Sequence, residues 1–295
     1  MRILFVGTVH FSRVMLRRLL EIDADVVGVI TGPDTGRNAD YADLTPICRE
    51  NNITCLVTDD INCLDTIAWV KDKSPDLILC LGWSRLLEQE FLSAPKMGVV
   101  GFHPTELPKN RGRHPLIWTL ALGLKQTAST FFFMDRGADS GDILSQEVVQ
   151  VSKDDDALSL YKKLEHVAKG QLVEMLNSLE SGRNFRVKQD AGKASYWRKR
   201  TESDGRIDWR MSSSSIHNLV RALSFPYPGA EFSMNDRIYK VWKSSPLVLE
   251  GVDNIEPGKV VDFTDNGNVV IKCGEGCIEL LDVEPALNVD KGRYI

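Results

Sequence analysis

Short, continuously apolar runs alternate with amphipathic stretches through the first hundred residues of the chain. The apolar runs lie at 2–7, 25–31, 53–57, 76–81 and 97–102, and the stretches with helical spacing lie at 11–20, 42–51 and 63–72. Strands that are apolar at every position are buried on both faces, and such strands alternating with helices are typical of a parallel sheet covered by helices. The pattern therefore predicts a doubly wound, Rossmann-like α/β domain.

The pattern changes in the second half of the chain. Two strand-like runs, 126–134 and 142–151, precede a long helix that we expect at 154–181. A polar and basic segment then leads to a helix and several short β-like runs, expected at 212–223, 238–242, 258–263, 269–273 and 277–283. We expect a Rossmann-like domain over 1–183, a linker over 184–205 and a small β-rich, OB-like domain over 206–295.

Composition limits the partners that such a chain can have. There are 36 Lys and Arg against 41 Asp and Glu, a formal net charge of −5. Enzymes that bind tRNA or DNA usually have a basic surface, because phosphate contacts supply much of their affinity. The composition therefore argues against a nucleic-acid partner.

The apolar runs are too short for membrane insertion or export. None approaches the roughly 18 residues that a membrane-spanning helix needs. The N-terminal run is followed at once by His10, Arg13 and Arg17, which is unlike a secretory signal. The six cysteines form no CxxC pair, so we expect reduced thiols and no metal site. We expect a cytoplasmic protein without a membrane partner.

Two loops are the best candidates for chemistry. Ligands of doubly wound domains bind beyond the carboxyl ends of the strands, and the run 97–102 leads to His103 in a loop with three prolines. Prolines fix the backbone φ angle and lower the entropy of the unfolded chain, which suits a preformed site. In the second loop, Asp139 has Gly137 and Gly141 two residues to either side, and glycines let the backbone approach a ligand closely.

Several motifs follow one another along the chain. They are Gly7-Thr8; Ser84-Arg85-Leu86-Leu87; His103 with Thr105-Glu106-Leu107-Pro108; Arg111-Gly112 with Pro115; Thr127-Ala128-Ser129-Thr130; and Met134-Asp135-Arg136-Gly137-Ala138-Asp139-Ser140-Gly141-Asp142. In this order they resemble the folate-dependent formyltransferase family, over about residues 2 to 285. The resemblance implies an enzyme that transfers a formyl group from N10-formyltetrahydrofolate to an amine, without a metal, in the domain over 1–183.

The resemblance also implies roles for individual residues. His103 would stabilise the oxyanion that forms when the amine attacks the formyl carbon, or move the amine proton, and Asp139 would orient His103. The residues expected on the folate side are Arg85, Leu86, Leu87, Gly137, Ala138 and Asp142. Those expected on the acceptor side are His10, Lys109, Asn110, Arg111 and Arg113, where arginine suits a diphosphate or carboxylate.

One position departs from the family. The residue two before the histidine is Asn in the family, where it helps to hold the formyl oxygen, and it is Gly101 here. Loss of one such donor commonly costs about two or three orders of magnitude in rate. We expect a replacement donor: Asn110, a nearby backbone N–H or protonated His103. The alternatives are a formyltetrahydrofolate hydrolase and a folate binder without activity.

The second half of the chain bears on the acceptor. Its motifs are Tyr196-Trp197, Asp204-Gly205-Arg206-Ile207-Asp208-Trp209, His217-Asn218-Leu219-Val220-Arg221-Ala222 and Pro226-Tyr227-Pro228-Gly229-Ala230. They most resemble formyltransferases that act on nucleotide-linked amino sugars, and a homodimer would accompany that resemblance. Methionyl-tRNA formyltransferase shares part of this region and is the alternative, but it tends to be more basic. The acidic balance of this chain favours the sugar.

Overall fold

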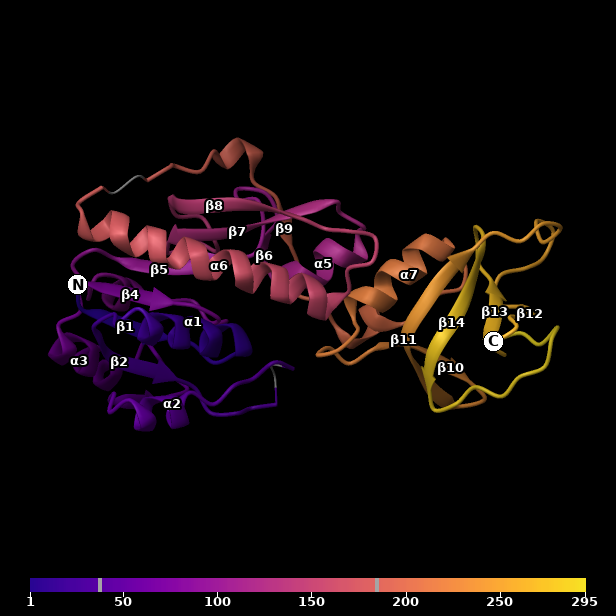
Figure 1. The fold of residues 1–295 in the computed structure, drawn as a ribbon, viewed down its shortest axis with the longest axis horizontal. Coiled ribbons are helices and arrows are strands. Elements are labelled where there is room, and N and C mark those ends of the chain that lie inside the picture. Colours follow the sequence, from indigo (N-terminus) through magenta and orange to yellow (C-terminus); the bar gives the residue numbers. More distant parts are fainter. Residues whose placement is uncertain (37–38, 184–185) are drawn as a thin grey trace. The chain divides into compact units, whose positions relative to one another are not determined.

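The computed structural model describes residues 1–36, 39–183 and 186–295 (Figure 1). The chain forms two compact units, described separately below. The first contains 1–115, 127–149 and 162–197, and the second contains 116–126, 150–161 and 198–295. Residues 184 and 185, which begin the predicted linker, lie outside the described residues. The boundaries given above for the domains and the linker stay predictions.

A seven-stranded sheet forms the centre of the first unit, in the order β3-β2-β1-β4-β5-β7-β8. Its strands are β1 (Ile3–Val6), β2 (Val26–Thr31), β3 (Cys55–Val57), β4 (Leu77–Cys80), β5 (Val99–His103), β7 (Gln126–Phe133) and β8 (Ile143–Gln150). The strands from β3 to β5 pair in parallel, and β7 pairs antiparallel with β5. The predicted fold class is confirmed, with a sheet that is mostly parallel.

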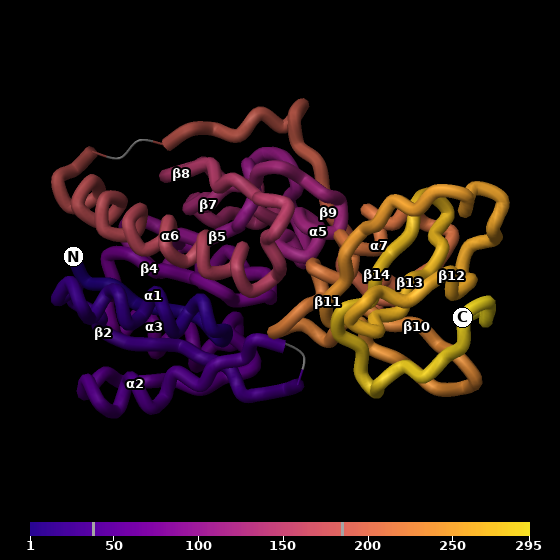
Figure 2. Tube along the Cα trace, turned by 45° about the vertical axis from the view of Figure 1, so that its right-hand side comes forward, coloured from indigo at the N-terminus to yellow at the C-terminus, as the bar shows by residue number. Residues whose placement is uncertain are grey.

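Helices alternate with these strands along the chain. They are α1 (His10–Glu21), α2 (Thr45–Glu50), α3 (Leu64–Lys73), α4 (Gln89–Leu92), α5 (Pro115–Ala121) and α6 (Ala157–Glu180). α1 and α6 lie side by side (Figures 1 and 2), and His10 Nε2 of α1 is 3.2 Å from Glu165 Oε1 of α6. The ring of Phe11 stacks on that of Phe102 with 4.3 Å between centroids. α1 therefore packs on the side of the sheet to which Phe102 points.

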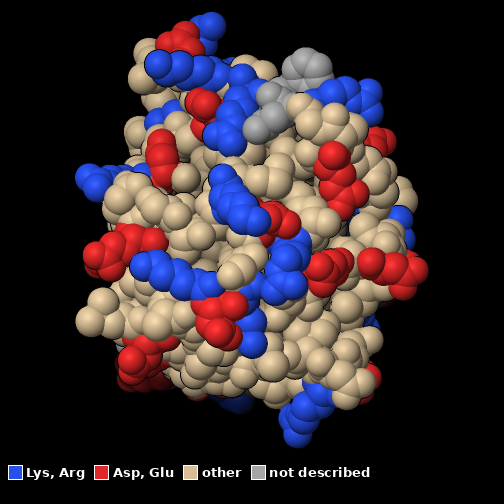
Figure 3. Space-filling view, turned by 90° about the vertical axis from the view of Figure 1, so that its left-hand side faces the viewer, with Lys and Arg blue, Asp and Glu red and all other residues tan. Residues whose placement is uncertain are grey.

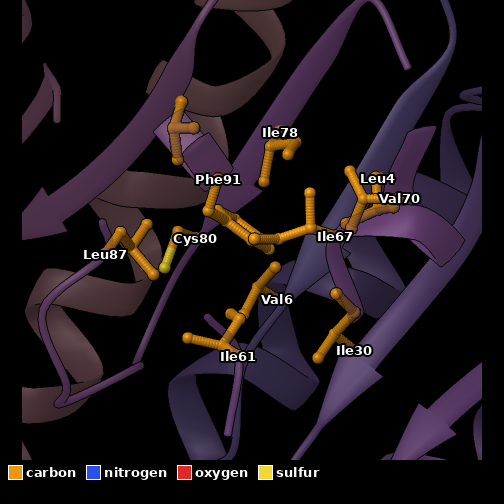
Figure 4. Close-up of a cluster of buried hydrophobic side chains, with 11 residues drawn as sticks. Leu4, Val6, Ile30, Ile61, Ile67, Val70, Ile78, Cys80, Leu87 and Phe91 are labelled. Atoms are coloured by element: carbon orange, nitrogen blue, oxygen red, sulfur yellow. The ribbon is translucent and has the colours of Figure 1, made fainter. Parts of the chain in front are cut away.

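Buried apolar side chains fill the opposite face of the sheet (Figure 4). They come from strands β1, β2, β4 and β5, from α3 and α4, and from loops; they are Leu4, Val6, Ile30, Ile61, Ile67, Val70, Ile78, Cys80, Leu87, Phe91 and Val99. Successive side chains of a strand point to opposite faces, so Gly101 and His103 lie on the face of Val99. β5 therefore delivers His103 to the carboxyl edge of the sheet, on the side of α3 and α4.

The second unit contains a five-stranded antiparallel sheet in the order β10-β11-β14-β13-β12. Its strands are β10 (Ala230–Met234), β11 (Arg237–Leu247), β12 (Val260–Phe263), β13 (Val269–Lys272) and β14 (Cys277–Glu284). Helix α7 (Ser213–Ala222) begins after Ser212, whose hydroxyl accepts a hydrogen bond from the Ser215 N–H. The prediction of a β-rich second region is confirmed.

Among the residues that the structure describes, no helix has both the length and the apolar character needed to cross a lipid bilayer.

Candidate active site

His103 is the last residue of β5 and is almost fully buried, with 4% of its surface exposed. Its Nε2 lies 2.8 Å from the backbone carbonyl oxygen of Asn110. A carbonyl oxygen only accepts hydrogen bonds, so Nε2 carries a proton and donates it. The other ring nitrogen, Nδ1, lies 3.5 Å from Oδ2 of Asp139. The imidazole is thus held between acceptors on two separate loops.

Asp139 approaches the imidazole from the turn between β7 and β8. Its φ angle is 53°, in the left-handed region, which Asp tolerates better than most residues. Its Oδ2 also accepts a hydrogen bond of 2.8 Å from the Gly112 N–H. Two residues later, the backbone of Gly141 passes so close to the Phe133 carbonyl that a Cβ would not fit. The glycine is therefore required by the shape of the turn that presents Asp139.

The turn around Asp139 is organised by Asp135. Its Oδ1 accepts hydrogen bonds from the Gly137 N–H at 2.9 Å and from the Ser140 hydroxyl at 2.6 Å. Gly137 and Ala138 are exposed, and their contact with folate stays a prediction. The Asp142 carbonyl accepts a hydrogen bond of 2.8 Å from the Phe133 N–H and closes the turn.

A segment far along the chain completes the site. The short strand β6 (Arg111–Gly112) pairs in parallel with β9 (Tyr196–Trp197). Gly112 has a φ of 107°, and a Cβ there would collide with the carbonyl oxygen of Trp197. Next to this pair, the Ser195 hydroxyl accepts a hydrogen bond from the Asn110 N–H at 2.9 Å and donates to Asn110 Oδ1 at 3.2 Å. The loop that holds His103 Nε2 is therefore itself fixed by residues 195–197.

Arg111 differs in setting from the other predicted acceptor-side residues. Only 4% of its surface is exposed. Its Nε and Nη2 donate to Gln189 Oε1 at 3.1 and 2.7 Å, and its Nη1 donates to the Tyr196 hydroxyl at 2.8 Å. A guanidinium engaged in this way supports the protein scaffold. Direct contact between Arg111 and an acceptor stays a prediction, and the geometry favours a structural role.

Lys109 and Arg113, by contrast, are exposed on either side of β6. Arg113 Nη1 donates a hydrogen bond of 2.8 Å to the carbonyl oxygen of Ser84. This contact joins the loop after β5 to the loop after β4, which was predicted to face the folate. Contact of Lys109 and Arg113 with an acceptor stays a prediction, and their exposure is compatible with it.

His10 stands at the carboxyl end of β1, two strands or about 10 Å across the sheet from β5. Its Nδ1 accepts a hydrogen bond of 2.8 Å from Arg13 Nη2. Burial, together with the nearby charge of Arg13, lowers the pKa of His10, whereas burial raises the pKa of Glu165. These contacts join α1 to α6, and a role of His10 in acceptor binding stays a prediction.

The predicted folate-side loop contains both surface and core residues. Arg85 is exposed, and Leu86 exposes 64% of its surface. Leu87 exposes only 4% and belongs to the apolar cluster of Figure 4. Arg136 Nε donates a hydrogen bond of 2.8 Å to Gln89 Oε1. This bond connects the Asp139 turn to α4, the helix that follows the folate-side loop. The structure thus brings the predicted folate-side loop, the His103 loop and the Asp139 turn together at one edge of the sheet.

Comparison with known proteins now identifies the fold. Residues 1–176 match the family model described as formyl transferase, and residues 199–289 match its C-terminal domain. The chain belongs to the formyl transferase family. The predicted resemblance is confirmed, and with it the prediction of a formyltransferase enzyme.

Relatives of this formyl transferase include enzymes named for different acceptors. The chain is 32% identical to the methionyl-tRNA formyltransferase of Caldanaerobacter subterraneus subsp. tengcongensis, over 96% of this chain and 92% of the relative. Among solved structures it is similar to WlaRD, a sugar 3N-formyl transferase crystallised with dTDP and 5-N-formyl-THF, with a TM-score of 0.71, 19% identity and coverage of 97% and 99% of the two chains. It is also similar to the N-formyltransferase of Helicobacter canadensis in complex with folinic acid and dTDP-3-aminofucose (TM-score 0.68, 20% identity, 94% and 98% coverage). At such identities these structures show the fold alone.

A side chain at position 101 of this formyl transferase would have to displace Met134. A Cβ there would lie 2.9 Å from Met134 Cγ and 3.2 Å from Phe132 Cζ. The backbone N–H groups of Asn110 and Gly112 already donate to Ser195 and Asp139. The identity of a replacement donor for the family's Asn stays a prediction.

Sequence reasoning missed the contribution of residues 186–197 to this formyl transferase. Tyr196 and Trp197 were singled out only as part of a motif, and Ser195 and Gln189 lay inside the predicted linker. The local sequence offers only a weak indication that Gln189 is buried: it is an uncharged residue between Lys188 and Asp190. Its partners, described above, become apparent only in three dimensions.

Proposed function

We propose that this formyl transferase moves a formyl group from N10-formyltetrahydrofolate to the amino group of a nucleotide-linked amino sugar. The observation that carries the proposal is the buried His103 at the end of β5, with Nε2 on the Asn110 carbonyl and Nδ1 facing Asp139. Such a ring has a hydrogen-bond acceptor beside each nitrogen. A proton taken up from the attacking amine would therefore be held in a hydrogen bond.

The proposed reaction balances without a further reactant. The amine nitrogen forms a bond to the formyl carbon, and the bond from that carbon to N10 of the folate breaks. The amine loses one proton and N10 gains one. Nδ1 of His103 is the ring nitrogen that would take up this proton, because Nε2 already donates its own to the Asn110 carbonyl, and Asp139 and Asn110 fix the orientation of the ring.

Three observations support a sugar as the acceptor. One structural neighbour is a sugar 3N-formyl transferase, and another is an N-formyltransferase in complex with dTDP-3-aminofucose. The formal net charge of the chain is −5. On the face shown in Figure 3, acidic and basic side chains are interspersed. The exposed Lys109 and Arg113 would bind the diphosphate of such a substrate.

A second candidate acceptor is methionyl-tRNA. The relatives found by sequence, at 30% and 32% identity, are named methionyl-tRNA formyltransferases. A tRNA substrate requires several phosphate contacts, so its binding falls steeply with salt concentration, whereas binding of a nucleotide sugar with two phosphates depends on salt much less. The salt dependence of KM therefore separates the two acceptors.

The deciding experiment measures release of tetrahydrofolate from N10-formyltetrahydrofolate. The acceptors are a panel of UDP-, dTDP-, GDP- and CMP-linked amino sugars, methionyl-tRNA, and no acceptor at all. Release that requires one amino sugar supports the proposal, and release that requires methionyl-tRNA replaces it. Release without an acceptor would identify a hydrolase, and folate binding without any release would identify a binder. The exposed His166 on α6 provides the control variant His166→Ala for His103→Ala.

A further inference from the structure

Gln189 is a buried residue between exposed neighbours in the segment that follows α6. It exposes 8% of its surface, while Lys188 and Asp190 are exposed. Its Oε1 accepts two hydrogen bonds from Arg111, at 3.1 and 2.7 Å. Its Nε2 donates two, to the carbonyl oxygens of Asp139 at 2.9 Å and Gly141 at 2.6 Å. One carboxamide thus joins β6 to the turn between β7 and β8.

The orientation of this carboxamide is determined by its partners. Arginine only donates hydrogen bonds and carbonyl oxygens only accept them, so Oε1 must face Arg111 and Nε2 must face the turn. Glutamate could accept from Arg111 but could not donate to the two carbonyl groups. A neutral side chain that accepts two hydrogen bonds through one atom and donates two through another is a carboxamide.

Both elements that Gln189 joins are in contact with His103. Arg111 follows Asn110, whose carbonyl accepts from His103 Nε2, and Asp139 faces Nδ1. Asn110 and Asp139 both have left-handed backbones, with φ angles of 61° and 53°. Such conformations in non-glycine residues persist when the surroundings hold them. The distance between the Asn110 carbonyl and the Asp139 carboxylate therefore depends on Gln189, which does not itself contact the His103 ring.

We infer that Gln189 is a positioning residue for His103 in the proposed formyl transfer. It holds the Asp139 turn and the Asn110–Arg111 backbone at the separation at which both contact the imidazole. The inference rests on the proposed function for its effect on rate, but its effect on the His103 ring is independent of any substrate. Loss of the amide N–H groups releases the Asp139 turn, whereas loss of Oε1 leaves Arg111 Nε and Nη2 without their acceptor.

Two variants separate the contribution of the hydrogen bonds to Arg111 from that of the hydrogen bonds to the Asp139 turn. Gln189→Glu keeps an acceptor for Arg111 and removes both donors to the turn, and Gln189→Met removes all four hydrogen bonds at similar volume. We expect kcat to fall at least about tenfold in both variants, because a small displacement of a catalytic group costs this much or more. KM for N10-formyltetrahydrofolate should change less than about threefold. The melting temperature should fall further for Gln189→Met, because the Nε and Nη2 groups of the buried Arg111 then lose their acceptor and only the bond from Nη1 to Tyr196 remains.

The matched control is Gln171→Met on α6. Gln171 is also buried and donates to the Ser129 carbonyl and the Ser145 hydroxyl. It should lower the melting temperature and leave kcat of the folded protein nearly unchanged. An equal loss of kcat in Gln171→Met and Gln189→Glu would show a general effect of stability and would overturn the inference. If Gln189→Met does not fold, the comparison of Gln189→Glu with Gln171→Met still decides.

A second readout needs no acceptor. The ¹⁵N signals of the His103 ring, followed against pH in the free protein, should change in Gln189→Glu and stay unchanged in Gln171→Met. Unchanged His103 signals in Gln189→Glu would overturn the positioning role even if the rate fell. Changed signals together with full activity of His103→Ala would uphold the placement of the ring by Gln189 and reject the proposed function of His103.

Discussion

Met134 lies over Gly101, on the face of β5 that also carries His103. A Cβ on residue 101 would be 2.9 Å from Met134 Cγ and 3.1 Å from its Sδ. The two residues therefore depend on each other: the glycine makes room for the methionine, and the methionine occupies the place where a larger residue at 101 would extend.

Gly101→Asn should destabilise the protein by about 1–3 kcal/mol, because an added side chain in a packed interior forces its neighbours to move. The double variant Gly101→Asn/Met134→Ala should recover part of that loss, since the smaller residue vacates the space. Urea unfolding of both single variants and the double variant gives the coupling free energy. Coupling near zero would mean that Met134 does not restrict residue 101. If an amide at residue 101 can act as the missing donor, the double variant should also exceed Met134→Ala in formyl-transfer rate.

His103→Ala and Asp139→Ala should each reduce formyl transfer at least about a hundredfold, since each removes part of the group that handles the proton. Neither should unfold the protein, as judged by circular dichroism. The exposed His166 gives a control: His166→Ala should keep the parental rate. A folded His103→Ala variant with near-parental activity would refute the assignment of His103.

Replacing each of the two neighbouring leucines in the folate-side loop by alanine should affect the unfolding free energy very differently. Leu87→Ala should cost about 2–5 kcal/mol of unfolding free energy, because Leu87 belongs to the apolar cluster and its truncation leaves a cavity. Leu86→Ala should change stability by less than about 0.5 kcal/mol, since Leu86 exposes 64% of its surface. If the loop lines the folate, Leu86→Ala should instead raise KM for N10-formyltetrahydrofolate. An unchanged KM would place the folate elsewhere.

Glu165 should make stability depend on pH. Burial raises its pKa above the usual 4.5. In the range from the unfolded pKa up to the raised folded pKa, the folded state binds more protons, so the free energy of unfolding falls as pH rises. Glu165→Gln removes this contribution and should therefore gain stability relative to the parent as the pH rises through that range. Melting temperatures between pH 4 and pH 8 test this, with Glu174→Gln, an exposed carboxyl on the same helix, as the control. A difference that does not change with pH would contradict the expectation.

The sequence pattern predicted the strands whose side chains are buried on both faces of the sheet. β1, β2, β4 and β5 are apolar at nearly every position because both of their faces are covered, and this is visible locally. β10, with the sequence Ala-Glu-Phe-Ser-Met, has no such run and was not predicted. α4 and α5 were not predicted either, because both are short. α5 begins at Pro115, in a segment whose three prolines indicated an irregular loop.

The proximity of candidate site residues was predictable where they lie in continuous motifs. His103 and Asp139 were selected from their loops, and the structure places them 3.5 Å apart. The burial of Arg111 was not predictable, because its acceptors Gln189 and Tyr196 lie 78 and 85 residues further along the chain. Strands of two residues, such as β6 and β9, have no period that a pattern could reveal.

The pairing of β6 with β9 also orders events during synthesis. A nascent chain that ends with α6, at Glu180, already contains all seven strands of the large sheet, but it lacks Gln189, Ser195 and β9. At that point the strands of the sheet and the helices α1 to α6 have been synthesised, whereas the residues that pair with the loop around His103 have not. The strands of the sheet and the residues that complete the candidate site are therefore synthesised at different times, and a product truncated after α6 would contain every strand of the large sheet but not the partners of the His103 loop.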